Sequence, residues 1–166
     1  FTIPDYSLPG MWKISDSVGG GNIGHVFGLD PTDEHSLTKG LIRGRQYVPE
    51  YEKYYKNYLT GFENMELIAT ASLLGIRESR RIRCIQTLTY QAFQTLAVFE
   101  NEIGRYNYSV DIHPSNPSLE EHKKTSGDFQ SRHLSKGQSY GIPYGALVPQ
   151  NTENLLVAGR CMGTDK

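Results

Sequence analysis

The first regular pattern of apolar positions along the chain begins near residue 30 and has helical spacing. Asp30 can accept hydrogen bonds from free backbone N–H groups and Pro31 suits a first helical position, so we expect a helix to begin there. Its apolar face consists of Leu37, Leu41, Ile42 and Val48. We expect Pro49 to end or kink this helix and a second helix to run on through Leu59.

The second helical stretch carries four tyrosines at helical spacing: Tyr51, Tyr54, Tyr55 and Tyr58. Such a stripe indicates either a packing face or a binding surface, and packing is the favoured interpretation. A further helix is predicted to start after Thr89, to carry Phe93, Leu96 and Ile103, and to end at Gly104.

The remaining apolar positions predict short strands. Residues 64–70 alternate between apolar and polar positions, as in a half-buried strand. Residues 140–148 also alternate, but Pro143 restricts them to at most an edge strand. The apolar run 154–158 predicts a buried parallel strand. These elements indicate an α+β fold with a mixed or antiparallel sheet and a few helices.

The charge balance argues against two classes of partner. Lys plus Arg is 17 and Asp plus Glu is 18, so the formal net charge of -1 gives no bulk attraction to nucleic acid or an anionic membrane. No apolar stretch approaches the roughly 20 residues of a membrane span. Cys84 and Cys161 are equally compatible with free thiols and with a bridge. The sequence leaves localisation open, with the cytoplasm favoured.

Neither the glycine pattern near the start of the chain nor the histidine spacing predicts a ligand site. G-x-G-x-x-G occurs at Gly19, Gly21 and Gly24, but a dinucleotide site needs a strand before it and a helix directly after it. Gly28 and Pro31 interrupt the stretch where that helix would lie, so a flexible loop is the favoured interpretation. The sequence has neither C-x-x-C nor H-E-x-x-H, and we expect no metal site.

Positive charge is concentrated between residues 77 and 83, at Arg77, Arg80, Arg81 and Arg83. The planar, paired donors of arginine match carboxylates and phosphates, so the segment is a candidate for holding an anionic substrate. A solvated basic turn, in which Glu78 pairs with one arginine, is an equally good interpretation of the spacing.

Two further positions are candidate functional residues. His113 follows an extended segment and is able to act as an acid or a base, with Asp111 on the same strand face to orient it. A lone histidine is more often structural, and His25 is a similar but weaker candidate. Gly159 ends the apolar run 154–158 and would permit close approach of the backbone to a ligand, although the run is also consistent with an ordinary core strand.

Four blocks of sequence together resemble the FAD-dependent oxidoreductases of the glutathione-reductase-like flavoprotein group. They are residues 24–33, residues 61–64 leading into 74–82, residues 110–114, and residues 140–144 leading into 154–161. The resemblance implies an enzyme that binds FAD noncovalently and passes a hydride between a small organic substrate and the flavin. It implies catalytic roles for His113 and Arg77. The residues that it places near the flavin are Arg80, Arg81, Gly159 and Arg160.

In that family these blocks belong to the later part of the chain. The sequence is therefore interpreted as a fragment of an FAD/NAD(P)-binding α/β flavoprotein, inactive alone, with residues 1–150 as a substrate-side domain and residues 151–166 as the start of the return into the FAD-binding domain. Its expected partners are the small-molecule substrate and the rest of the parent flavoprotein, and its exposed interdomain surface could drive self-association. The alternative is a non-catalytic interaction domain that uses the tyrosine-rich helix and the polar segment 114–139, which is predicted to be a long loop.

The chain departs from the usual pattern of this family at three positions. After Arg81 and Ile82 the family usually has a glycine and then an aromatic residue, where this chain has Cys84 and Gln86. An acidic residue expected after Thr89 is replaced by Ala92.

Overall fold

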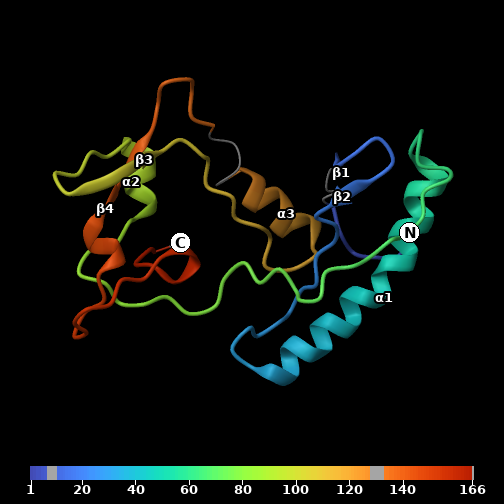
Figure 1. The fold of residues 1–166 in the computed structure, drawn as a ribbon, viewed down its shortest axis with the longest axis horizontal. Helices are drawn as coiled ribbons and strands as arrows, with labels where there is room; N and C mark the ends of the chain where they lie inside the picture. Colours follow the sequence, from blue (N-terminus) through green and yellow to red (C-terminus); the bar gives the residue numbers. More distant parts are fainter. Residues whose placement is uncertain (7–10, 128–132, 166) are drawn as a thin grey trace. The chain divides into compact units, whose positions relative to one another are not determined.

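The computed structural model describes residues 1–6, 11–127 and 133–165, which form two compact units. Unit 1 comprises Phe1–Ile76 and Pro114–Lys123, and unit 2 comprises Arg77–His113 and Lys124–Lys166. Over the described residues, each unit contains a two-stranded antiparallel sheet and helical segments (Figure 1). The predicted α+β class with antiparallel pairing is confirmed.

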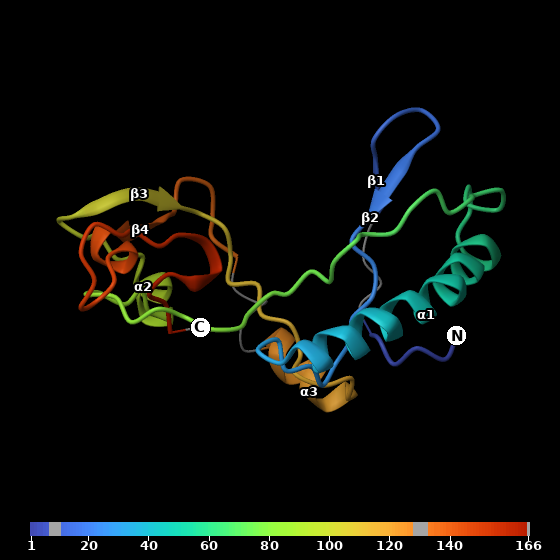
Figure 2. The same cartoon turned by 60° about the horizontal axis from the view of Figure 1, so that its bottom comes forward.

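Unit 1 consists of a small hairpin, a long helix and extended segments. Strand β1 (Met11–Lys13) pairs antiparallel with β2 (Gly19–Gly21), and the two strands lie side by side in Figure 2. The predicted flexible loop at the glycine pattern is therefore wrong over β2. Helix α1 (Glu34–Tyr58) begins after Asp33, whose carboxylate accepts hydrogen bonds from the backbone N–H groups of the first turn.

Helix α1 passes through Pro49, where the sequence predicted an end or a kink followed by a second helix. Proline removes one hydrogen bond inside a helix. The following turns bury Tyr51 and Tyr55, which form the core of unit 1 with Ile3, and this burial outweighs the lost bond. The interpretation of the tyrosine stripe as a packing face is confirmed at these two positions, whereas Tyr58 is 70% exposed.

Unit 2 is built around a strand pair and a short helix. Strand β3 (Glu102–Tyr106) pairs antiparallel with β4 (Tyr140–Pro143), which makes β4 an edge strand, as predicted. Helix α2 (Tyr90–Thr95) begins after Thr89, as predicted, and buries Phe93. It ends at Leu96 in the left-handed conformation, where Ala97 donates to the carbonyl of Ala92. The predicted continuation to Gly104 is wrong, because these residues enter β3.

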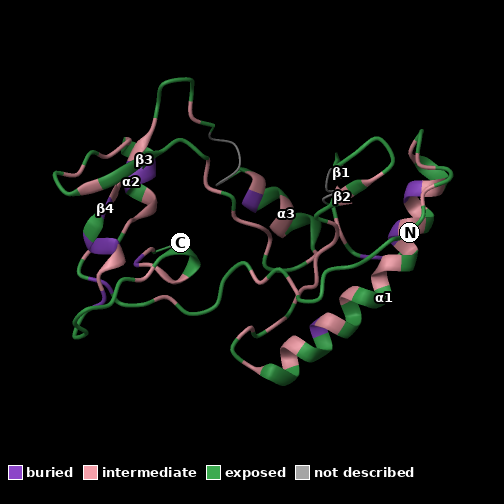
Figure 3. Cartoon of the chain, viewed as in Figure 1, coloured by how far each residue is buried: buried purple, intermediate pink, exposed green. Residues whose placement is uncertain are grey.

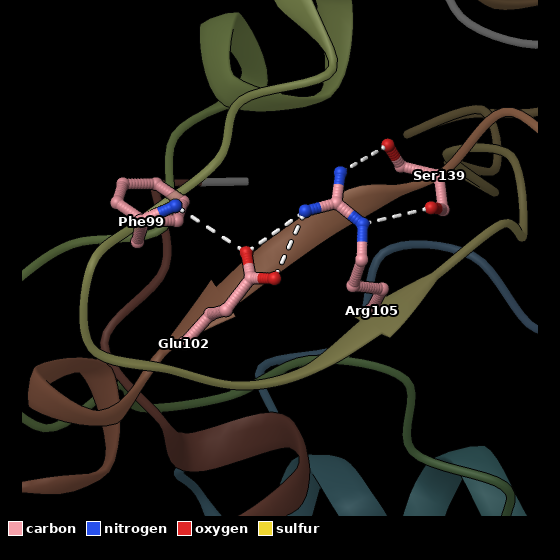
Figure 4. Close-up of polar contacts among 4 residues, drawn as sticks. All are labelled: Phe99, Glu102, Arg105 and Ser139. Carbon is pink, nitrogen blue, oxygen red and sulfur yellow. Dashed lines mark hydrogen bonds and ion pairs between the residues drawn. The ribbon is translucent and has the colours of Figure 1, made fainter.

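A polar clamp fixes the β3–β4 pair (Figure 4). Arg105 donates to both carboxylate oxygens of Glu102 at 3.0 and 2.9 Å, and to the side chain and carbonyl of Ser139 at 2.9 and 2.8 Å. The hydrogen bond from Arg105 holds the pKa of Glu102 below its ordinary value. Gly141 lies against the Glu102 carboxylate, and a Cβ atom at this position would overlap Oε2 of Glu102, so a glycine is needed beside the clamp.

Three predicted segments differ in the structure. Residues 64–70 and 154–158 lie outside both sheets, and most of these residues are exposed (Figure 3). A strand needs a ladder of backbone hydrogen bonds with a neighbouring strand. Val157 donates its N–H to the carbonyl of Leu147 at 2.8 Å, but neither run forms such a ladder among the described residues. The polar segment predicted as a loop, 114–139, contains helix α3 (Leu119–Thr125).

Candidate functional site

The arginine segment of unit 2 is hydrogen-bonded to the last described residues. Ile82 donates its N–H to the carbonyl of Cys161 at 2.9 Å, and Arg81 donates to the carbonyl of Asp165 at 3.0 Å. The structure therefore joins the arginine segment to Cys161, which lies two residues after Gly159 in the sequence. The predicted pairing of Glu78 with one arginine is also present, since Glu78 contacts Arg81.

The carboxylate of Asp111 joins two of the predicted functional residues. Its Oδ2 atom accepts a hydrogen bond from Arg77 Nη2 at 2.8 Å, and its Oδ1 atom lies 3.3 Å from His113 Nε2. All three side chains are partly exposed. The contact between Asp111 and His113 was expected from their spacing, but the link to Arg77 was not, because 34 residues separate the two positions.

The arginines of this segment differ in what they contact. Arg77 is tied to the carboxylate of Asp111, and Arg81 to that of Glu78. Arg80 is exposed and makes no hydrogen bond or ion pair with any residue that the structure describes. The sequence alone could not distinguish these roles. The sequence patterns also missed Asp165. Its carboxylate accepts hydrogen bonds from the N–H of Tyr90 at the start of α2, and its backbone carbonyl accepts one from Arg81.

Gly159 adopts a backbone conformation that favours glycine. Its φ is +74°, and a Cβ atom placed there would have no heavy atom within 4 Å. It begins the short 3-10 helix η3 (Gly159–Cys161) rather than following a strand, so the prediction of a buried strand before it is wrong. The backbone at this glycine is open to close approach by another molecule.

The described residues contain neither a metal cluster nor a membrane-spanning helix. No group of three or more His, Cys, Asp or Glu side chains among them is placed to hold a metal ion. None of their helices is long and apolar enough to cross a membrane. Both cysteines are free thiols: Cys84 is buried, and Cys161 is partly exposed.

A family model described as FAD dependent oxidoreductase matches residues 3–166. The chain belongs to this family. No curated protein and no solved structure matches it. Membership of the FAD dependent oxidoreductases agrees with the resemblance in the sequence and supports oxidoreductase character with FAD as the cofactor of the family.

The residues of unit 2 that were predicted to approach the flavin suit part of an FAD molecule. The open backbone at Gly159 suits a flat ring, and the exposed guanidinium of Arg80 suits negative charge. The described residues do not form the strand, glycine turn and helix that would hold the pyrophosphate: Gly19–Gly21 is itself β2, and α1 begins only at Glu34. The described residues thus lack a pyrophosphate cradle, whereas Gly159 and Arg80 are accessible to a bound molecule.

The three departures from the usual family pattern are accommodated by packing. The amide oxygen of Gln86 accepts from the Asn101 side chain at 2.7 Å and from the N–H of Gly145 at 3.1 Å. Cys84 is buried against Gly163, where an added Cβ atom would come within 2.8 Å of the Cβ of Cys84. Ala92 is also buried, so a carboxylate at this position would lose its hydration.

Proposed function

We propose that this FAD dependent oxidoreductase resembles the glutathione-reductase-like flavoproteins and transfers a hydride between a small organic substrate and the flavin. FAD, when bound, supplies the redox chemistry. The observation that carries the proposal is the Asp111 carboxylate, which holds an arginine and a histidine together in a chain whose family uses FAD.

On the substrate side, Arg77 would bind and orient an anionic group. Its Nη2 atom contacts Asp111, and its remaining N–H donors are suited to a carboxylate. His113 would take up or release the substrate proton that accompanies hydride transfer. The negative charge of Asp111 would stabilise both cationic side chains, so it supports this arrangement electrostatically.

On the flavin side, Arg80, Arg81 and Arg160 would provide positive charge and Gly159 would allow close approach. Arg81 would act mainly by fixing the segment, since it already contacts Glu78 and the carbonyl of Asp165. Arg80 would have more N–H donors to offer to the flavin than Arg81. We further propose that residues 151–166 join an FAD-binding domain, because Leu155 and Leu156 in the apolar run 154–158 are 50% and 55% exposed. The pyrophosphate would then be held by the rest of the flavoprotein.

The alternative function, a non-catalytic interaction domain, loses two of the tyrosines of its proposed surface. The tyrosine-rich face of α1 is occupied by packing at Tyr51 and Tyr55, so these rings are not available to a partner. We therefore favour the enzyme.

The first experiment tests for flavin. The protein is expressed in its full natural reading frame, and its visible spectrum is recorded before and after incubation with FAD. A yellow protein with flavin absorbance supports the proposal. A colourless protein that cannot be reconstituted with FAD contradicts it.

The second experiment tests Arg77 with a matched arginine of the same unit. Arg77→Gln should lower the rate of flavin reduction by about 10²–10³-fold, since it removes charge stabilisation from the reacting groups, while the melting temperature stays close to that of the wild type. Arg105→Gln breaks the β3–β4 clamp and should lower the melting temperature, with less effect on the rate per folded molecule. Equal losses of rate and stability in both variants would show that Arg77 is structural.

The third experiment tests Gly159 with a glycine of similar backbone geometry. Gly159→Ala and Gly137→Ala both place a side chain at positive φ, +74° and +89°, where neither Cβ atom meets protein within 4 Å. The backbone strain is therefore comparable, but only Gly159→Ala should weaken FAD retention. Unchanged FAD affinity in Gly159→Ala would remove this glycine from the cofactor site.

A further inference from the structure

Residues 66–73 of unit 1 form an exposed segment whose backbone is unpaired. Every residue of the segment is exposed, and its large apolar side chains are Leu67 at 48%, Ile68 at 75% and Leu73 at 76%. Its N–H and C=O groups make no hydrogen bond to any residue that the structure describes. A row of unpaired backbone groups between exposed apolar side chains is a template for pairing with another strand.

Both ends of the segment are anchored on unit 1. Met65, just before it, packs against the core that contains Tyr51 and Tyr55. Leu74, just after it, lies against the first half of α1, 3.1 and 3.6 Å from the positions that Cβ atoms would take at Gly40 and Gly44. The chain therefore runs back in the direction opposite to α1 (Figure 2). A segment held at both ends loses less conformational entropy when it pairs.

The sequence of the segment points to an identical copy as its partner. Residues 67–73 read Leu-Ile-Ala-Thr-Ala-Ser-Leu, which is a palindrome about Thr70 in which only positions 68 and 72 differ. Antiparallel pairing centred on Thr70 places Ala69 opposite Ala71 of the second copy, and the two Thr70 side chains opposite each other. Such a contact is the same for both copies, as a two-fold dimer requires.

Charge selects the antiparallel direction. Glu66 is the one charged residue between positions 65 and 76. Parallel pairing in register would place the two Glu66 carboxylates on neighbouring strands at the same level, where like charges are destabilising. Antiparallel pairing centred on Thr70 separates them by eight residue positions, or about 27 Å.

The backbone bends at Ser72 and Leu73. The straight part of the segment already contains residues 69–71, the centre of the palindrome. Straightening the bend extends the pairing outward, so that Leu67 lies opposite Leu73 of the second copy.

We propose that residues 66–73 pair as an antiparallel strand with the same segment of a second copy of this chain, centred on Thr70. A two-stranded pair needs support from a helix or a further strand, and the anchors at Met65 and Leu74 hold each strand on its own unit 1. The contact is at the small end of specific interfaces, so the dimer is reversible with a micromolar dissociation constant. This dimer does not depend on the flavin chemistry proposed for unit 2.

The first test is analytical ultracentrifugation over a dilution series. The wild type should pass from dimer to monomer on dilution. Adjacent residues of a strand direct their N–H groups to opposite edges, so the double variant Ala69→Pro/Thr70→Pro removes a donor from whichever edge pairs, and it should raise the dissociation constant by about tenfold or more. Neither N–H has a partner among the described residues, so the melting temperature, followed by Trp12 fluorescence, should stay close to that of the wild type.

The second test determines the register by disulfide formation with oxidised glutathione. Thr70→Cys and Ile68→Cys are compared in a Cys161→Ser background, because Cys161 is the partly exposed native thiol and Cys84 is buried. The two cysteines at position 70 would have Cβ atoms about 4.5–5.5 Å apart, whereas those at position 68 would be offset by four residue positions, or about 14 Å. Thr70→Cys should therefore form the linked dimer about tenfold faster. Random collision predicts no such advantage, since Ile68 is 75% exposed.

Three results would overturn the proposal: a wild type that is monomeric throughout the series, a dimer that the proline variant leaves unchanged, or equal rates of crosslinking at positions 68 and 70. If the proline variant does not fold, the cysteine pair decides. Hydrogen exchange on the full natural reading frame separates another occupant: a monomer in which the amides of residues 66–73 are protected would show that a different part of the flavoprotein covers the segment, and would also overturn the proposal.

Discussion

Replacing Gly24 with alanine would test the backbone geometry on which unit 1 depends. Gly24 is in the left-handed region, where a residue with a Cβ atom is less stable by about 1–2 kcal/mol. The new methyl group would also lie 2.8 Å from one ring carbon of Tyr51 and 3.1 Å from its hydroxyl oxygen. Because this ring is buried and hydrogen-bonded to Asp5, it has little freedom to move.

Overpacking of this kind usually destabilises a protein by about 1–3 kcal/mol. The two effects together predict that Gly24→Ala lowers the free energy of unfolding by about 2–5 kcal/mol. Gly28→Ala provides a control, since its φ of +71° is similar and no atom lies within 4 Å of the new Cβ. It should lose only the backbone part, about 1–2 kcal/mol.

Gly44→Ala completes the series with a change of opposite sign. Gly44 lies inside α1, where alanine is favoured over glycine by about 0.5–1 kcal/mol, and its nearest neighbours would be at 3.4 and 3.6 Å. Urea unfolding would be followed by the fluorescence of Trp12, which lies in β1 of unit 1 and is the one tryptophan of the chain. If Gly24→Ala were no less stable than Gly28→Ala, the close packing of Gly24 on Tyr51 would be wrong.

Three substitutions test the packing elsewhere in the two units. Pro49→Ala should raise the free energy of unfolding of unit 1 by about 1–3 kcal/mol, because it restores a hydrogen bond inside α1, and an unchanged urea midpoint would contradict the continuous helix. Phe93→Ala should destabilise unit 2 by about 3–5 kcal/mol, whereas exposed Tyr58→Ala should have little effect on unit 1; comparable losses in calorimetry would argue against the burial of Phe93. Glu102→Gln should destabilise unit 2 at neutral pH: the folded-state pKa of Glu102 is lowered, so its contribution is present above the unfolded-state value of about 4.3 and disappears as pH falls through the folded-state pKa. A stability difference that persists in acid would show that the charge is not responsible.

The sequence determined the local features that depend on neighbouring residues. Thr89 caps a helix as predicted, because its side chain needs only the N–H of Ala92, three residues away. The spacing of the tyrosines indicated a packing face in the same way, and the class of antiparallel α+β structure could be inferred from short apolar runs separated by turns. Where a helix ended was less predictable: α1 continues through Pro49 because distant residues pack on it.

In the candidate site, too, the sequence predicted local features and the structure decided the distant contacts. Sequence patterns identified Arg77, His113, Gly159 and the family resemblance, since each rests on residue type and short spacing. They could not show that Asp111 joins Arg77 to His113, or that Arg81 contacts Asp165 while Arg80 is left exposed. They also could not show the contact between His25 and Asp5, because the two residues lie 20 positions apart in the sequence.

Residue types and near-neighbour spacing thus determined the class of fold and which side chains could bind an anion or exchange a proton. Tertiary structure alone decided which of those groups meet. The physical reason is that hydrogen bonds and ion pairs act over about 3–4 Å, a distance that chain folding sets and that sequence separation does not reveal.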